Sequence, residues 1–324
     1  MFRHKLSIIA ILLLLPFSAV TSFGWDETGH KIAAYIAWQQ MRPDVRDKVI
    51  KILLSAPEDA QLSTFYMGYG SQTQEERRIE FFLIAATWPD IIKDRNYPVR
   101  FKKYNNSDWH YFDNLWTDKS GKVELLPAGD DGGKLMEKLP ELDKVIRGTA
   151  TNPEKAVAIA WLEHLIGDIH QPLHVTGRVT ADQPKGDQGG NLFSLTPKGT
   201  SRDKADNLHR FWDGVIDRTV PNSKDLCDTD YLVPIAKEII KKYPYAKLQD
   251  RIADGKFDVW EKEGVDLTAA EVYKGLTLSE PPSNEYKKKA FEIAQERIAF
   301  AGYRMGDLFN EVFGAAVSTP TVNK

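Results

Sequence analysis

A single apolar stretch of the chain, WLEHLIGDIHQPLH at residues 161–174, contains three of the seven histidines and an aspartate. His164 and Asp168 are four residues apart, so on a helix they lie on one face and could bind one metal ion. His170 and His174 repeat this spacing. Because a helix turns by about 100° per residue, an unbroken helix would point the second pair roughly a third of a turn away from the first.

Pro172 makes an unbroken helix through this stretch unfavourable. The proline ring removes a backbone N–H and disfavours the helical conformation at the preceding residue, Gln171. We therefore predict that the chain bends here, and that the bend allows His174 to face a neighbouring ion. The stretch is predicted to be the centre of a metal site.

The other candidate ligands are also histidines and aspartates. His209 and Asp213 are four residues apart in a predicted helix. Asp90 ends the apolar run IEFFLIAATWPD, where a buried carboxylate is costly unless it is paired or bound to a metal. His30 and His110 complete the set. Imidazole and carboxylate ligands without thiolate suit zinc better than manganese or iron.

The first 24 residues have the layout of a secretory signal peptide. Basic Arg3 and Lys5 precede an almost wholly apolar run at 6–20, and small residues follow up to Gly24. The run is shorter than the roughly twenty apolar residues of a membrane span, so no stable membrane anchor is expected. Cleavage after Gly24 would make Trp25 the first residue of a secreted or periplasmic protein.

Taken singly, each candidate ligand has an ordinary structural explanation. A histidine and an aspartate four apart more often form a surface pair. A lone histidine is more often a hydrogen-bonded core residue, and Asp90 could cap the next helix. The metal-site hypothesis depends on their number, because all but one of the six histidines after residue 24 have ligand spacing beside a carboxylate or lie near the expected N-terminus.

Composition limits the class of protein and the nature of its surface. The 324 residues can bury a large core, and no repeat or interdomain linker stands out. Residues 1–24 hold two of the 43 basic residues and none of the 46 acidic ones, which leaves 41 against 46 and a formal charge of −5. A broad basic binding surface is therefore not expected. Cys227 is the only cysteine, which excludes an intramolecular disulfide.

Helical periodicity and capping residues predict an all-α fold, a mostly helical single domain with a short β-hairpin. Helices are predicted after Asp26, from Pro43, from Lys134, from Pro153 into the histidine-rich stretch, and over 204–218, 232–242, 256–275 and 284–313. The apolar run from Ile79 to Asp90 is predicted to be a buried segment. Residues 115–133 predict a short hairpin, and KGDQGGN within 175–203 predicts another. The domain is expected to span residues 25–313, before a frayed tail at 314–324.

Seven motifs together resemble a known family: WDETGH, TWPD, WHYFD, HLIGDIHQPLH, GDQGGN, NLHRFWD and AGYRMGDLFN. The chain is similar to the single-strand-specific zinc nucleases, the nuclease S-one/P-one type with the plant bifunctional nucleases. These are related in fold to zinc-dependent phospholipase C. The resemblance extends from Trp25 to about Asn310 and implies a helical fold with three zinc ions at the bottom of a cleft.

The resemblance implies a role for each candidate ligand. One zinc would bind Trp25, His30 and Asp168, a second would bind Asp90, His110, His164 and Asp168, and the third would bind His174, His209 and Asp213. Asp168 would bridge two ions through its two carboxylate oxygens. Trp25 would bind through its α-amine and carbonyl oxygen, so only cleavage before Trp25 would complete the site. His170 has no ligand counterpart, and we expect it either to support a ligand or only to pack.

The implied chemistry is the hydrolysis of phosphate esters. A zinc pair lowers the pKa of a bridging water toward neutrality, and the hydroxide would attack phosphorus while the third zinc stabilises the leaving O3′. Asp90 and Asp168, which hold that pair, are assigned as catalytic. Tyr111 and Asp113 match the family's base-stacking and base-hydrogen-bonding positions and are assigned to substrate binding. Both could instead be ordinary residues at the edge of a loop.

The leading hypothesis is an exported zinc-dependent endonuclease that cleaves single-stranded DNA and RNA to 5′-phosphorylated products and acts on 3′-nucleotides. A cleft that binds a base favours unstacked single strands, because duplex bases are inaccessible. Two alternatives are a zinc-dependent phospholipase C and a non-catalytic, zinc-stabilised binding protein. No protein partner is predicted.

Overall fold

The computed structural model describes residues 25–68, 70, 72–119, 122–127, 132–224, 226–253 and 255–314. The predicted signal peptide and all but the first residue of the predicted tail lie outside these ranges.

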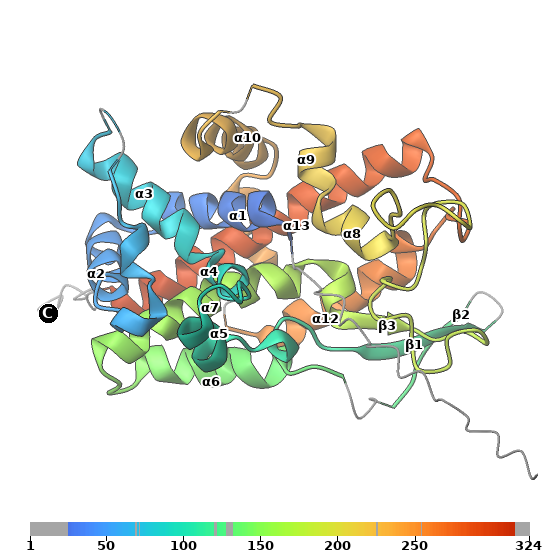
Figure 1. Cartoon of the computed structure of the whole chain (residues 1–324), viewed down its shortest axis with the longest axis horizontal. Helices are drawn as coiled ribbons and strands as arrows, with labels where there is room; N and C mark the ends of the chain where they lie inside the picture. The colour runs from blue at the N-terminus through green and yellow to red at the C-terminus, as the bar shows by residue number, and fades with distance from the viewer. Residues whose placement is uncertain are drawn as a thin grey trace, which may run out of the picture.

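Helices dominate the described chain, as predicted (Figure 1). They are α1 (Glu27–Gln40), α2 (Pro43–Leu53), α3 (Gln74–Ala85), α4 (Trp88–Ile91), α5 (Pro98–Tyr104), α6 (Leu135–Arg147), α7 (Asn152–His170), α8 (Leu208–Asp213), α9 (Val215–Thr219), α10 (Asp228–Lys242), α11 (Tyr245–Leu248), α12 (Phe257–Leu267) and α13 (Asn284–Phe313). Short 3₁₀ turns are η1 (Glu58–Ala60), η2 (Ser63–Phe65), η3 (Ser107–Trp109), η4 (Pro172–Val175) and η5 (Gln249–Arg251), and η6 (Thr268–Val272) is a π-helical turn.

Helices α1 and α13 pack closely through the middle of the molecule (Figure 1). A Cβ added at Gly302 would lie 2.5 Å from the Cβ of Ile36, and one at Gly306 would lie 2.6 Å from the Cβ of Gln40. The Gln40 amide donates a hydrogen bond of 2.6 Å to Asp307. The glycines of the AGYRMGD motif therefore allow the backbones of the two helices to approach each other.

Helix α7 carries the centre of the predicted metal site. Its first turn is closed by the side chain of Glu154, which accepts a hydrogen bond of 2.8 Å from the backbone N–H of Thr151. The helix ends at His170, because Gln171 is extended with ψ 115° and Pro172 opens η4. The predicted bend is therefore confirmed.

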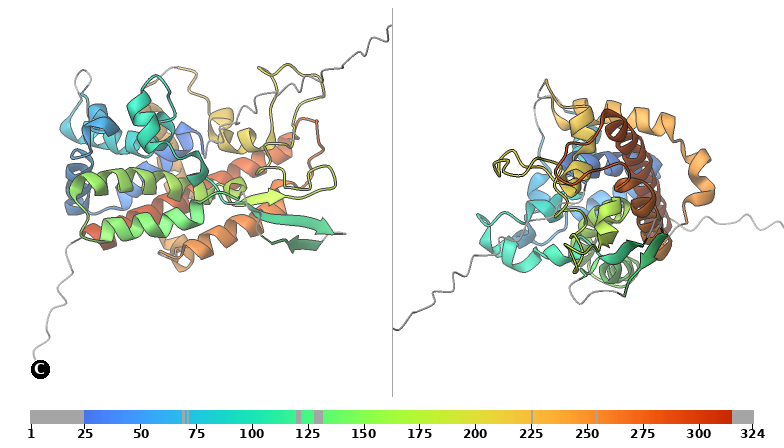
Figure 2. Two further views of the ribbon diagram at one scale, coloured as in Figure 1. Left: turned by 60° about the horizontal axis from the view of Figure 1, so that its bottom comes forward. Right: turned by 90° about the vertical axis from the view of Figure 1, so that its right-hand side faces the viewer.

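The described chain contains a small sheet at one end of the molecule (Figure 2). Its strands, in the order β2-β1-β3, are β1 (Asn114–Lys119), β2 (Lys122–Leu125) and β3 (Thr176–Arg178). β1 and β2 are antiparallel, with Trp116 opposite Leu125, so the hairpin predicted within 115–133 is confirmed.

The second predicted hairpin, within 175–203, is wrong. β3 pairs in parallel with β1, a neighbour distant in sequence, instead of with a following strand. The KGDQGGN motif folds into turns, with positive φ at Gly186, Gly189 and Gly190. Three glycines in left-handed conformations suit a compact loop and interrupt a strand.

Two helix predictions need correction, and one helix was missed. The helix expected over 204–218 is two helices, α8 and α9, interrupted at Gly214. The helix expected over 256–275 is α-helical only to Leu267 and continues as η6. Helix α5 was not predicted, because seven residues are too few to establish a helical period. No helix in the described part of the chain is long and apolar enough to cross a membrane.

Candidate metal centre

Three groups of histidine and aspartate side chains converge near the bend after α7. Within each group the potential ligand atoms lie within 4.8 Å of one another. The groups are His30, His164 and Asp168; Asp90, His110 and His164; and His174, His209 and Asp213. All eight histidines and aspartates predicted as ligands are therefore brought together. They come from α1, α4, α7, η4, α8 and the loop after η3.

Asp168 lies at the centre of this arrangement and is fully buried. Its Oδ1 lies 3.3 Å from Nε2 of His30 and 3.8 Å from Nδ1 of His174. Its Oδ2 lies 3.1 Å from Nδ1 of His110 and 3.4 Å from Nε2 of His164. The two oxygens thus face different histidines, as a carboxylate that bridges two ions must.

A glycine allows α1 and α7 to bring their ligands into contact. A side chain at Gly167 would overlap the imidazole of His30. With no Cβ in the way, the rings of His30 and His164 stack, with centroids 3.9 Å apart and planes at 16°. The glycine that precedes Asp168 in the LIGD sequence is therefore required by the close packing of the ligands.

Backbone carbonyls orient the rings of the third group. Nδ1 of His174 donates a hydrogen bond of 2.7 Å to the carbonyl of His110, and Nδ1 of His209 donates one of 2.7 Å to the carbonyl of Gly189. A side chain at Gly189, which has φ +58°, would overlap a backbone carbonyl of η4. The GDQGGN motif thus positions His209, a role that sequence reasoning missed.

Sequence reasoning also missed two further hydrogen-bond partners of the candidate ligands, the carbonyl of Ala86 and the amide of Gln171. Nδ1 of His164 donates a hydrogen bond of 2.8 Å to the carbonyl of Ala86, at the end of α3. The Gln171 amide donates one of 2.7 Å to Oδ1 of Asp213. The only available signal for Gln171 was its place within the HQPLH motif. Such outer partners fix the orientation of metal ligands and increase their basicity.

The electrostatics of the buried groups fit a bound cation. Burial lowers the pKa of both His30 and His110 to about 4, so the imidazoles are neutral, as metal ligands must be. Burial raises the pKa of Asp168 to about 6, because a negative charge at this position is removed from water. Among the residues that the structure describes, both ring nitrogens of His30, Nε2 of His110 and Oδ1 of Asp168 have no hydrogen-bond partner. Buried polar atoms without partners are costly, and a cation held by these atoms would remove that cost.

Comparison with known proteins agrees with this geometry. The model of the S1/P1 Nuclease family matches residues 25–314. The chain belongs to the S1/P1 nuclease family. Family membership assigns it to the metal-dependent nucleases, hydrolases that act on the ester bonds of nucleic acids.

Similar proteins match over almost their whole length. Endonuclease 2 of Arabidopsis thaliana is 24% identical over 325 residues, covering 96% of this chain and 98% of its own. Nuclease S1 of Aspergillus oryzae is 25% identical over 309 residues, covering 90% and 95%. Endonuclease 1 of Arabidopsis thaliana is 25% identical over 331 residues, covering 96% and 95%.

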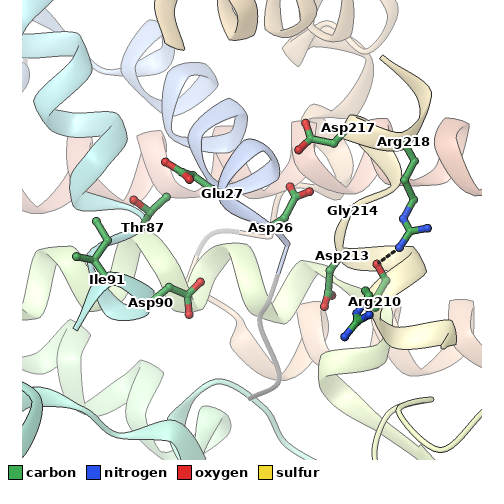
Figure 3. Close-up of a pocket in the computed structure, with 10 residues that line it drawn as sticks. All are labelled: Asp26, Glu27, Thr87, Asp90, Ile91, Arg210, Asp213, Gly214, Asp217 and Arg218. Carbon is green, nitrogen blue, oxygen red and sulfur yellow. Dashed lines mark hydrogen bonds between the residues drawn. The ribbon is translucent and has the colours of Figure 1, made fainter. Parts of the chain in front are cut away.

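In this S1/P1-family chain, a pocket of about 640 Å³ reaches two of the candidate metal groups. Asp90 of α4 and Asp213 of α8 lie on opposite sides of it, and Asp26 lies between them (Figure 3). Oδ1 of Asp90 accepts a hydrogen bond of 2.6 Å from Nζ of Lys93, a cation that the sequence analysis did not assign. The pocket gives a ligand access to the edge of the metal centre.

Trp25, the expected first residue of the mature chain, is fully buried and lies two residues before the start of α1. The next residue, Asp26, donates its backbone N–H to the carbonyl of Asp213 at 3.1 Å. The carbonyl of Asp26 accepts the N–H of His30 at 3.1 Å. The backbone beside Trp25 is therefore attached to residues of the first and third groups.

The two predicted substrate-binding residues lie in a loop fixed to the metal centre. Between them, Phe112 donates its backbone N–H to the carbonyl of His174 at 2.8 Å. Tyr111 and Asp113 are both half-buried. Burial, reinforced by the nearby charge of Asp187, raises the pKa of Asp113 to about 7. The structure thus places this pair beside the third group.

His170 is directed toward the protein core. Its Nδ1 donates a hydrogen bond of 2.6 Å to the carbonyl of Ile166, and its Nε2 accepts one of 2.8 Å from Arg304 of α13. Arg304 also forms an ion pair with Glu263 of α12 at 2.8 Å. His170 therefore joins the end of α7 to two other helices.

Proposed function

We propose that this S1/P1-family nuclease is a zinc endonuclease that cleaves single-stranded DNA and RNA to 5′-phosphorylated products. The same site would hydrolyse 3′-nucleotides. The observation that carries the proposal is the convergence of three histidine and aspartate groups around Asp168. Three zinc ions per chain would provide partners for the buried ring nitrogens and the Asp168 carboxylate.

The roles of the side chains follow from their positions. Zinc ions bound at these groups would lower the pKa of a coordinated water toward neutrality and offset the charge of the phosphate. Asp168 would keep two ions at a fixed separation, and Asp90 would hold one of them at the edge of the pocket. Lys93, bound to Asp90, adds a positive charge on the same side. These features favour a phosphate ester as the substrate.

Export and processing belong to the same proposal. Residues 1–24 have the composition of a signal peptide, and its removal before Trp25 would release an α-amine one residue before Asp26, whose backbone is hydrogen-bonded to His30 and Asp213. We expect that amine, with the Trp25 carbonyl oxygen, to bind the zinc ion shared by His30 and Asp168. The mature protein would then be secreted or periplasmic.

The proposed base site consists of Tyr111 and Asp113. The loop that carries them is bonded to His174, so a base that stacks on Tyr111 would lie near the ions. Asp113 would accept or donate a hydrogen bond to the base according to its protonation state. Such a site would bind an unstacked base and would exclude duplex DNA.

Side-by-side assays of the zinc-loaded mature protein test this proposal. We expect hydrolysis of heat-denatured DNA, RNA and 3′-nucleotides, with 5′-phosphorylated products from both polymers. Asp168→Asn should reduce all these rates by at least about 100-fold, because the shared ligand is lost. Release of diacylglycerol from phosphatidylcholine without nucleotide release would overturn the nuclease proposal in favour of a phospholipase C. Zinc content without turnover on any substrate would indicate a binding protein.

A further inference from the structure

A basic and partly aromatic segment follows Asp90. Residues 93–104, KDRNYPVRFKKY, contain five lysines and arginines and one aspartate, in a chain whose overall formal charge is −3. Residues 94–99 are all exposed. The segment therefore forms a local positive region on a protein that is otherwise acidic, beginning next to the metal centre.

Tyr97 presents an exposed aromatic ring in this segment, with 47% of its surface accessible. The guanidinium of Arg100 lies 4.4 Å from the centre of that ring. Arg100 is itself buried, and its Nη2 donates a hydrogen bond of 3.1 Å to the carbonyl of Ile91, next to Asp90. The ring is therefore held by a residue anchored to α4 and remains accessible to a ligand.

Two exposed cations lie on either side of Tyr97 in the sequence. The guanidinium of Arg95 lies 5.2 Å from the centre of the Phe101 ring, and Lys102 is on the exposed side of α5. Neither cation forms an ion pair within the part of the chain that the structure describes. Lys103, by contrast, is paired with Asp59 at 2.6 Å. Arg95 and Lys102 are thus available to contact anions.

We propose that Tyr97, Arg95 and Lys102 bind the single-stranded nucleic acid beyond the scissile phosphate. A base would stack on Tyr97, and the two cations would contact backbone phosphates. An aromatic ring interleaved with cations is the usual composition of surfaces that bind single strands without sequence preference. The inference rests on the proposed function, and it names a subsite whose three residues do not line the pocket beside Asp90 and Asp213, so a mononucleotide bound in that pocket would not contact them.

The test compares a long substrate with a small one. The variants are Tyr97→Ala and the double variant Arg95→Gln/Lys102→Gln. Tyr97→Phe is a control that keeps the ring. Lys237→Gln/Lys241→Gln, on exposed positions of α10, is a control for the loss of two charges. Rates are measured on denatured DNA and on a 3′-mononucleotide. Binding of a labelled phosphorothioate single strand is measured over a series of salt concentrations.

Tyr97→Ala should weaken binding of the strand by about 5- to 100-fold. The Arg95/Lys102 double variant should reduce the slope of log K against log salt by about 1.4, because each phosphate contact on a single strand contributes about 0.7. KM for denatured DNA should rise in Tyr97→Ala and in the double variant, whereas their rates on the 3′-mononucleotide should stay unchanged. The two control variants should match the wild-type protein in strand binding and in both rates.

Unchanged strand binding in both test variants, or an equal loss on both substrates, would overturn the inference. Failure of the wild-type protein to hydrolyse either substrate would contradict the proposed function instead. In that case, comparing the binding of the phosphorothioate strand by the variants and by the wild-type protein would still show whether Tyr97, Arg95 and Lys102 form the subsite.

Discussion

The Nε2 atoms of His174 and His209 lie 3.1 Å apart. Each ring donates its Nδ1–H to a backbone carbonyl, so two acceptor lone pairs face each other. An Asp213 oxygen lies 3.5 Å from Nε2 of His209. Two imidazole acceptors and a carboxylate at these distances repel one another unless a cation lies among them. This relationship is the physical basis for an ion in the third group.

Gln171 provides a selective test of that group, because its amide holds Asp213. Gln171→Leu should weaken the binding of one zinc ion by about 10- to 100-fold and leave the other two unchanged. Titration with a competing chelator measures the three affinities. Gln39→Leu, at an exposed position near the end of α1, is the matched control. An equal loss of all three ions would argue against a separate third site.

Asp113 predicts a specific pH dependence of stability. Its pKa is raised from 3.8 to about 7, so the folded protein retains a proton that the unfolded chain releases. The stabilising contribution of this proton is complete below pH 4 and is lost as the pH rises through 7. Asp113→Asn should therefore raise the Tm at pH 8, by an amount equivalent to about 1–3 kcal/mol for a half-buried group, and have no effect at pH 4. Thermal unfolding at both pH values measures this, and a pH-independent difference would contradict it.

Local features of the site could be predicted from the sequence, whereas its long-range supports could not. The spacing of His164 and Asp168, and the bend at Pro172, depend only on neighbouring residues. The carbonyl of Gly189 that holds His209 could not be recognised, because every residue has a carbonyl and only the folded loop selects one.

The errors in the fold prediction have the same origin. β3 was expected to form a hairpin with a nearby strand, but it pairs with the distant β1. The KGDQGGN segment folds into turns, with positive φ at three glycines, and does not lead β3 into a second strand. A single helix was also expected across Gly214, because the helical pattern of the sequence continues there, but the structure separates α8 from α9 at this residue. Pairing partners and helix breaks depend on tertiary contacts that periodicity does not contain.

The contact between α1 and α13 predicts a loss of stability on enlarging a glycine. In Gly302→Ala the new Cβ would lie 2.5 Å from the Cβ of Ile36, so the helices must separate. We expect a decrease of about 1–3 kcal/mol in the free energy of unfolding. Urea denaturation measures this decrease, with Lys288→Ala on the exposed side of α13 as the control. Equal stability of the two variants would mean that the helices can adjust at this crossing.

The proposed role of the Trp25 α-amine predicts an effect of adding a single residue. A glycine placed before Trp25 would convert the amine into an amide, which is a poor zinc ligand. The zinc ion shared by His30 and Asp168 should then bind more weakly, and the rate on denatured DNA should fall. A glycine added at the C-terminus is the control. An unchanged zinc content and rate would exclude the α-amine as a ligand.

The most direct test of the account is the metal content of the mature protein, purified with its N-terminus at Trp25. Three groups of ligands joined by Asp168 predict three zinc ions per chain. A content of one zinc ion or none, in protein that cleaves single-stranded DNA at full rate, would contradict the proposed centre.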